Sequence, residues 1–269
     1  MSKSRIRRIG VKLSRLLPAA LWRPMRSIGT GVVTPIRFSL TSGHWKSSLA
    51  MSACTATGAP IPWYTYPAID FLTQRSFEGK NVLEFGGGQS TLWWSARAQS
   101  VLTIEEDSDW YERLRSRVAR NVGIHHVPVD HATRSVASVK ALLDAQPIRA
   151  FDVIVVDGHL RQEVTALAFD YLEPDGAMIL DNSEGYGFYE AIKDRNCRRV
   201  DFFGFAPGVS LRHCTSIVFL KDCFLLNPKI PIPVIEEMER GEESLRTKVY
   251  AVSSTETLAR WRAIKSATA

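Results

Sequence analysis

The sequence of 269 residues lacks several features that mark particular classes of protein. It has four cysteines and no CxxC pair, so neither a zinc ribbon nor a disulfide framework is indicated, and we expect a reducing, cytoplasmic location. No short period recurs, which excludes solenoid and collagen-like classes. We find no apolar run of the length of a transmembrane helix. With 45% hydrophobic residues, the chain can bury the core of one large domain.

Acidic residues are absent from the first 69 positions, where ten Lys or Arg residues lie, and the first acid is Asp70. The rest of the chain has 24 basic and 28 acidic side chains, so its net charge is about −4. The net charge of +6 and the pI of 9.2 therefore come from the N-terminal arm. We predict no nucleic-acid partner from this distribution.

The basic arm covers residues 1–45. Its apolar residues recur at helical spacing between Lys and Arg, which predicts a short amphipathic helix that Pro18 and Pro24 interrupt. We expect peripheral contact with an anionic membrane surface through residues 1–26. A helix docked on the body, a disordered basic tail and a transit peptide remain alternatives. The apolar positions are Ile6, Ile9, Leu13, Leu16, Leu17 and Leu21.

The strongest local pattern lies at residues 81–97. An apolar strand ends in Glu84, a tight turn contains Gly86 and Gly88, and a helix-compatible run follows. Glycines at these positions let a ligand lie against the backbone at a helix N-terminus. The dinucleotide fingerprint would require a glycine where this chain has Thr91. An acid at this strand end repels a pyrophosphate and suits a ligand with a cationic amine.

These residues resemble the first motif of the class I S-adenosylmethionine (SAM)-dependent methyltransferases, an acid followed by GxGxG. Glu84, Gly86 and Gly88 match it, and Ser90 stands where a third glycine is common. The resemblance implies that these four residues bind SAM. It also implies a doubly wound, Rossmann-like α/β domain whose seven-stranded, mostly parallel sheet ends in an antiparallel C-terminal hairpin.

Two further positions extend the predicted donor site. Glu105 ends a second apolar run nineteen positions after Gly86, close to the spacing at which a carboxylate meets a ribose diol. In the family the acid at this strand end has that role. The family also commonly places a polar residue after the third strand, near the adenine, and Asp130 is the candidate.

Two more strands end in polar residues, Asp157-Gly158-His159 and Asp181-Asn182. In an open parallel sheet these ends should converge beside the donor, and three oxygen ligands suit Mg²⁺. The arrangement looks like the cation-dependent O-methyltransferases, which implies Asp157, Asp181 and Asn182 as metal ligands, with Asp157 also beside SAM. The catechol-type members have a Lys where this chain has Leu160.

The Asp-Gly-x-His loop of macrolide-sugar O-methyltransferases is nearer to this chain, although the histidine here comes one residue earlier. We therefore predict His159 as general base, because a neutral imidazole suits removal of a hydroxyl proton, with Asp157 as a second catalytic residue. An ordinary Asp-Gly turn and an N-cap at Asn182 or Ser183 are the structural alternatives.

The resemblance covers roughly residues 60–222 within a predicted domain at 46–224. The aromatic-rich lead at 60–72 resembles an uncharacterised methyltransferase-like group, some members of which are linked to glycan assembly. The Pro-rich segment and helix at 225–269 have no assigned role.

The resemblance implies methyl transfer from SAM to a hydroxyl of a small molecule or glycan. Three rivals are a nicotinamide-dependent oxidoreductase, a non-methylating relative of hydroxylase type and an inactive, membrane-tethered assembly partner. The oligomeric state is open.

Overall fold

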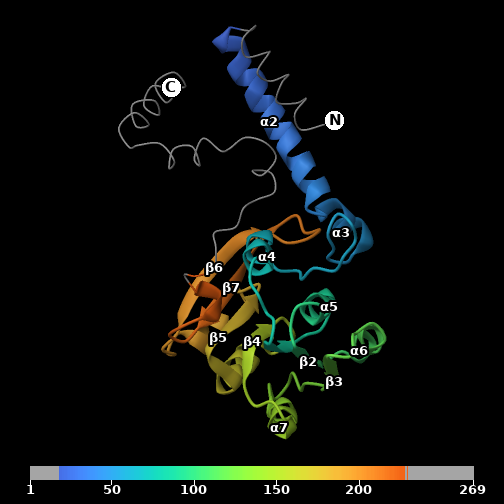
Figure 1. Ribbon diagram of the computed structural model, residues 1–269, viewed down its shortest axis with the longest axis vertical. Helices are drawn as coiled ribbons and strands as arrows, with labels where there is room; N and C mark the ends of the chain where they lie inside the picture. The colour runs from blue at the N-terminus through green and yellow to red at the C-terminus, as the bar shows by residue number, and fades with distance from the viewer. Residues whose placement is uncertain (1–17, 228, 230–269) are drawn as a thin grey trace. The chain divides into compact units, whose positions relative to one another are not determined.

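A computed structural model describes residues 18–227 and residue 229 (Figure 1). Helices and strands alternate along most of this part of the chain, as expected of an α/β domain. In chain order the elements are α2 (Ala19–Thr41), α3 (His44–Ala50), α4 (Tyr66–Thr73), β1 (Asn81–Phe85), α5 (Gln89–Ser95), β2 (Ser100–Glu105), α6 (Ser108–Arg115), β3 (Val122–His126), α7 (Ala137–Ala145), β4 (Phe151–Val156), α8 (Arg161–Ala168), η1 (Phe169–Tyr171), β5 (Leu172–Asp181), α9 (Phe188–Ile192), β6 (Arg198–Phe205), β7 (Arg212–Phe219) and η2 (Phe224–Leu226).

The strands form one seven-stranded sheet in the order β3-β2-β1-β4-β5-β7-β6. The first five in chain order pair in parallel, and β7 pairs antiparallel with both β5 and β6. The predicted doubly wound, Rossmann-like sheet with an antiparallel C-terminal hairpin is confirmed. The strand order reverses between β1 and β4, so a ligand crevice is expected outside the carboxyl ends of these two strands.

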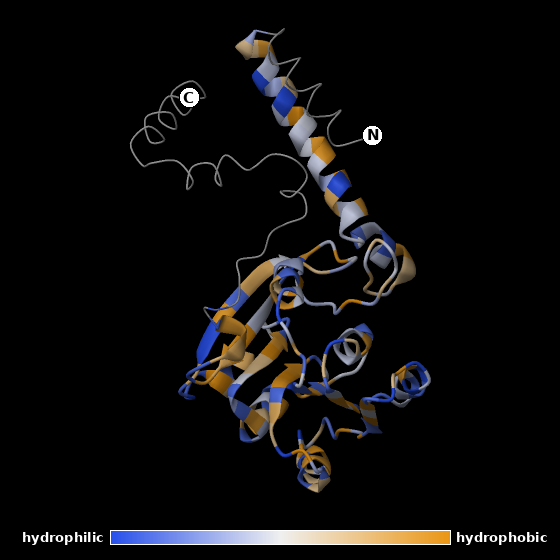
Figure 2. Ribbon diagram, in the orientation of Figure 1, coloured by the Kyte–Doolittle hydropathy of each residue, from blue (hydrophilic) through white to orange (hydrophobic). Residues whose placement is uncertain are grey.

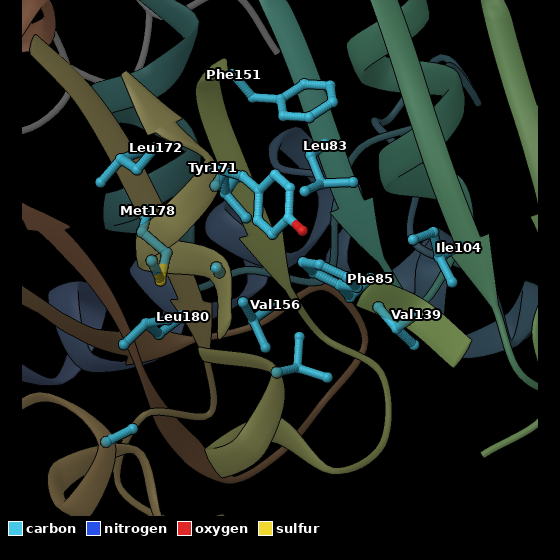
Figure 3. Close-up of a cluster of buried hydrophobic side chains, with 14 of the residues drawn as sticks. Leu83, Phe85, Ile104, Val139, Phe151, Val156, Tyr171, Leu172, Met178 and Leu180 are labelled. Atoms are coloured by element: carbon cyan, nitrogen blue, oxygen red, sulfur yellow. The ribbon is translucent and has the colours of Figure 1, made fainter. Parts of the chain in front are cut away.

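The core has two parts, because successive side chains of a strand point to opposite faces of the sheet. Leu83 and Phe85 of β1 contribute to the cluster that also contains residues of α7, α8 and α9 (Figure 3). Val82, the residue before Leu83, belongs to the other cluster, which includes residues of α4 and α5. The same alternation directs the side chain of Glu84 toward the α4 and α5 face, and Glu84 is fully buried there.

The N-terminal arm differs from the prediction. Residues 1–17 lie outside the described part of the chain, and α2 begins directly after Pro18 and continues through Pro24 and Pro35 to Thr41. A proline inside a helix removes one hydrogen bond and frees a carbonyl. Because no residue of α2 is buried, water can reach those carbonyls, so the prolines need not end the helix. Within the described residues, no helix combines the length and apolar character that crossing a bilayer requires.

The segments after β5 complete the described part of the chain. The second strand of the hairpin is β7 at Arg212–Phe219, and the helix after β5 is the short α9 at Phe188–Ile192. Between β5 and α9 the chain forms a turn in which Asn182, Tyr186 and Gly187 have positive φ. Of the predicted segment 225–269, only residues 225–227 and 229 lie in the described part of the chain.

Candidate active site

A cavity of about 610 Å³ lies at the carboxyl ends of β1, β2 and β4. Its wall comes from the three loops that follow these strands, from the segment after β3, and from two aromatic residues of more distant loops. Six predicted site residues line it, whereas Glu84, Asp130, Asp181 and Asn182 do not. The lining residues are Trp63, Gly86, Gly87, Gly88, Gln89, Ser90, Glu105, Glu106, Trp110, His131, Arg134, Asp157, Gly158, His159, Leu160, Arg161 and Tyr186.

The glycine turn after β1 has one crowded and one open position. Gly86 has a φ of 83°, and a Cβ there would lie 2.6 Å from the backbone nitrogen of Gly158. The two loops can therefore approach each other only because both residues are glycines. At Gly88 a Cβ would meet nothing nearer than 3.9 Å, so a side chain would occupy the cavity instead of clashing with the protein. Gly88 thus forms a cradle for a ligand.

Glu105 places a carboxylate in the cavity wall at the end of β2. One oxygen accepts a hydrogen bond from the backbone N–H of Gly87 at 2.7 Å, and the other accepts from that of Asp107 at 2.9 Å. Burial raises the pKa of Glu105, and these backbone donors oppose the rise. Each oxygen has a second lone pair, so the carboxylate can still accept two hydroxyl donors of a bound diol.

Glu84 lies beneath the glycine turn. Thr91 and Thr103 donate hydroxyl hydrogen bonds to its Oε2, and the hydroxyl of Thr91 also accepts from the backbone N–H of Gly88. Its Oε1 has no partner among the described residues. Burial raises the pKa of Glu84 to about 7 despite these hydrogen bonds. Glu84 therefore supports the turn from below, and the predicted contact with a cationic amine would need this covered carboxyl to be reached.

The predicted metal ligands come together, but around an arginine. The guanidinium of Arg161 lies 3.0 Å from Asp157 Oδ1, donates to the backbone oxygens of Asp157, Gly158 and Asp181, and reaches Asn182 Oδ1 at 3.4 Å. These contacts involve all three nitrogens of the guanidinium, and the side chain is only 10% exposed.

With Arg161 between its members, this donor set does not fit Mg²⁺, and the predicted magnesium site has no support in the structure. A divalent cation bound by Asp157 would be repelled by the guanidinium beside it. One oxygen of Asp181 also accepts from Thr215 at 2.9 Å. No group of three or more His, Cys, Asp or Glu residues in the described part of the chain could hold a metal. The cation of this site is Arg161.

The two carboxyls next to Arg161 have pKa values above those of ordinary aspartates. Burial raises the pKa of Asp157 to about 6, while Arg161 opposes that rise and Glu106 adds to it. Burial and the charge of Asp157 raise the pKa of Asp181 well above its ordinary value. Burial and their mutual repulsion therefore make two charged carboxylates here unfavourable, and Arg161 stabilises the charge of Asp157, its ion-pair partner.

His159 joins a cluster formed by the loops after β2, β3 and β4. Its backbone N–H donates to Glu106 Oε1 at 2.8 Å, and its Nδ1 lies 3.6 Å from the same oxygen. The same ring nitrogen lies 3.2 Å from Nε2 of His131. The imidazole is 58% exposed and borders the cavity, so it can exchange a proton with a bound molecule.

Asp130 lies outside the cavity wall. It accepts hydrogen bonds from the backbone N–H of Ala132 and the hydroxyl of Thr133, and these contacts lower its pKa. Asp130 therefore stabilises the turn after β3, and His131, the next residue, is the one that faces the cavity.

Several cavity residues were not predicted from the sequence. Trp110 donates its indole N–H to the carbonyl of Gly87 and presents an aromatic face to the cavity. Trp63 is held by a hydrogen bond of 2.9 Å to the carbonyl of Pro207, and the ring of Tyr186 lies 4.2 Å from the Arg161 guanidinium. Arg134 pairs with Glu163. Among these four residues, Trp110 alone carries a local signal, because it lies in the first turn of α6, three residues after the N-cap Asp107.

No protein-family model and no curated protein sequence matches this chain. Among solved structures, it is similar to the O-methyltransferase TomG from Streptomyces achromogenes in complex with SAM, with 18% identity, a TM-score of 0.48 and coverage of 82% of this chain and 99% of that one. An O-methyltransferase from Bacillus cereus in complex with SAH has 17% identity, a TM-score of 0.47 and coverage of 72% and 96%. The tRNA (m1A58) methyltransferase TrmI from Aquifex aeolicus has 18% identity, a TM-score of 0.41 and coverage of 60% of this chain and 71% of that one. Similarity at this level concerns the fold alone. The function must therefore be argued from the chemistry of the site.

Proposed function

We propose that this protein is a SAM-dependent methyltransferase that acts on a hydroxyl group of a small molecule or glycan. The observation that carries the proposal is the position of Glu105, whose carboxylate lies in the wall of the cavity that the glycine turn borders. A carboxylate at this place can bind both hydroxyls of a ribose, and the Gly88 cradle lets the ligand lie against the backbone. A cavity of about 610 Å³ falls within the usual size of ligand pockets.

The charges in the cavity wall favour a sulfonium donor over a dinucleotide. Glu105, Glu106 and Asp157 contribute carboxyl groups. The two lining arginines, Arg134 and Arg161, both have carboxylate partners within the described residues. A pyrophosphate would therefore meet repulsion without a free cation from the wall to offset it, whereas a positively charged ligand is attracted. This argues against a nicotinamide-dependent oxidoreductase.

The donor supplies a methyl group on a sulfonium, and the carbon–sulfur bond breaks as the acceptor oxygen bonds to that carbon. The chain's contribution to this step is to orient both molecules, to exclude water and to take the hydroxyl proton. We assign the proton to Nε2 of His159. The Nδ1–H tautomer donates to Nε2 of His131, 3.2 Å away, and leaves Nε2 of His159 free, while Glu106, 3.6 Å from Nδ1, stabilises the imidazolium that forms.

The acceptor side of the cavity is aromatic. Trp63 and Tyr186 border it, and their rings are partly exposed. Flat aromatic faces pack against the C–H faces of sugar rings and against planar rings alike, which is consistent with a glycan or an aryl alcohol. Arg161 stacks on Tyr186, and each of its three nitrogens already donates to an oxygen of the protein, so we do not assign it an acidic substrate.

The test is a transfer assay with methyl-labelled SAM and a panel of glycans and aryl alcohols. We expect label in an acceptor with the wild type, and at least a hundredfold lower rate with His159→Ala, the usual scale for losing a general base. The matched control is His126→Ala, because His126 is exposed and does not line the cavity. An active His159→Ala variant would remove this base from the mechanism, and the absence of transfer to every member of the panel would count against the hydroxyl acceptor.

A further inference from the structure

Helix α2 presents an apolar face that no described part of the chain covers. Its residues Leu21, Met25, Ile28, Val32 and Ile36 follow one another at spacings of three or four, so they lie along one side of the helix. Each is between 51% and 68% exposed, and α2 contains no buried residue. Five large aliphatic side chains in a continuous row exceed the scattered exposure that is normal for a protein surface.

The opposite side of the same helix is polar and basic. Arg23, Arg26, Thr30 and Thr34 fall there, and Figure 2 shows hydrophobic and hydrophilic bands alternating along α2. No acidic residue lies in α2 or anywhere in the first 69 positions of the sequence. The helix is therefore amphipathic with charge of one sign only.

We propose that α2 is an in-plane membrane anchor that lies on an anionic lipid surface. The apolar row would enter the boundary between headgroups and acyl chains, and the arginines would meet the negative surface potential. At about 1.5 Å per residue the 23-residue helix is about 35 Å long, ample for such a contact. Trp45 follows in α3 with 59% exposure, and tryptophan is enriched at membrane interfaces.

The C-terminal end of α2 packs against the catalytic domain. The ring of Phe38, in the last turn of α2, lies 5.1 Å from the ring of Tyr66 in an edge-to-face contact and 5.9 Å from that of His44. Gly43, with φ of 83°, packs so closely on Cys54 and Ala56 that a Cβ there would lie within 2.6 Å of their backbone. These contacts fix the C-terminal end of α2 and leave the apolar row beyond it without partners in the described chain.

A second copy of the chain is a poorer occupant of this face. Pairing two apolar rows would place Pro24 and Pro35 beside the contact, and Arg23 and Arg26 of both copies would lie on the far sides, where they would add nothing to the pairing. A nucleic acid would engage the arginines and leave the aliphatic row in water. Lipid satisfies both faces at once.

The experiment is vesicle flotation of the full chain with phosphatidylcholine vesicles, with and without added phosphatidylglycerol. We expect binding to the anionic vesicles that weakens with salt. Ile28→Asn with Val32→Asn should reduce the partition coefficient roughly tenfold or more, because two aliphatic side chains leave the lipid. The matched control, Ser27→Asn with Thr30→Asn, lies on or beside the polar side and should bind like the wild type.

Arg23→Gln with Arg26→Gln should lower binding to anionic vesicles roughly tenfold or more and leave the weak binding to neutral vesicles unchanged. Two results would overturn the proposal. One is the absence of vesicle binding by the wild type. The other is dimerisation in light scattering, without vesicle binding, that the Ile28→Asn and Val32→Asn pair abolishes, since a second copy would then cover the face.

Discussion

Replacing Arg161 by methionine should destabilise the fold in a strongly pH-dependent way. Methionine keeps much of the aliphatic volume and removes the guanidinium. Arg161 and Asp157 have side chains that are only 10% and 23% exposed, and removing one partner of such a buried pair costs about 3–5 kcal/mol when the other stays charged. The variant also loses the donors to the backbone oxygens of Gly158 and Asp181.

The pH dependence follows from Asp157, whose pKa is about 6 with Arg161 in place. Without the guanidinium that pKa rises further, so at pH 5 the carboxyl is protonated in the folded variant and no uncompensated charge is buried. At pH 8 the variant must either bury the charge or bind a proton at a cost. We therefore expect a loss of about 3 kcal/mol at pH 8 and roughly 1 kcal/mol at pH 5.

Urea unfolding of the two proteins at both pH values measures these losses. Arg134→Met is the matched control, because Arg134 also lines the cavity but its pair with Glu163 is more exposed, and its loss should stay below about 1 kcal/mol. Equal losses for both variants, or a loss for Arg161→Met that does not change with pH, would refute the account of Arg161 as the counter-ion of this site. The same account predicts that methyl transfer by the wild type is unchanged by EDTA and by added Mg²⁺.

Three more predictions concern the donor site. Glu105→Ala should weaken binding of S-adenosylhomocysteine by about 1.5–3 kcal/mol in calorimetry, whereas the control Glu112→Ala on α6 should bind it like the wild type. Equal affinities of Glu105→Ala and the wild type would remove Glu105 from the site. Glu84→Gln should stabilise the fold by roughly 2–3 kcal/mol at pH 8 and little at pH 4. The reason is that the Glu84 carboxyl has a pKa of about 7 in the folded protein, so its burial destabilises the protein increasingly as pH rises from about 4.5 to 7. A pH-independent effect in urea unfolding would contradict this. Gly86→Ala should cost about 3 kcal/mol of stability, because residue 86 has a positive φ and the new Cβ would lie 2.6 Å from a backbone atom of Gly158. Gly88→Ala should keep the melting temperature and lose donor affinity. A stable Gly86→Ala variant together with an unstable Gly88→Ala variant would mean that the two glycines have been assigned the wrong roles.

The sequence predicted the sheet and part of the cavity wall for identifiable reasons. Apolar runs that end in polar residues mark the strand ends of a parallel sheet, and these ends must meet at one edge. Gly86, Gly88, Ser90, Glu105, Asp157 and His159 reach the cavity in this way.

The face that Glu84 occupies could have been predicted from the strand alone. It alternates with Leu83 and Phe85, so its side chain lies on the face of Val82. Its carboxyl is therefore covered, and only its hydroxyl partners Thr91 and Thr103 connect it to the turn.

Arg161 was not predicted because acids and histidines are the usual metal ligands and most arginines in a sequence lie at the protein surface. One signal was present. Arg161 is the first residue of α8, where the helix dipole disfavours a cation, so a positive charge there needs carboxyl or carbonyl partners. The contacts of the loops after β2 and β3, which bring Glu106 and His131 to His159, depend on tertiary packing and have no local signature.

The most direct test of the donor site is titration calorimetry of the full chain with S-adenosylhomocysteine, with NAD as the control ligand. We expect micromolar binding of S-adenosylhomocysteine that Mg²⁺ does not change and no measurable binding of NAD. Binding of NAD to the same site, or no binding of S-adenosylhomocysteine, would contradict the assignment of this cavity to a SAM-dependent methyltransferase.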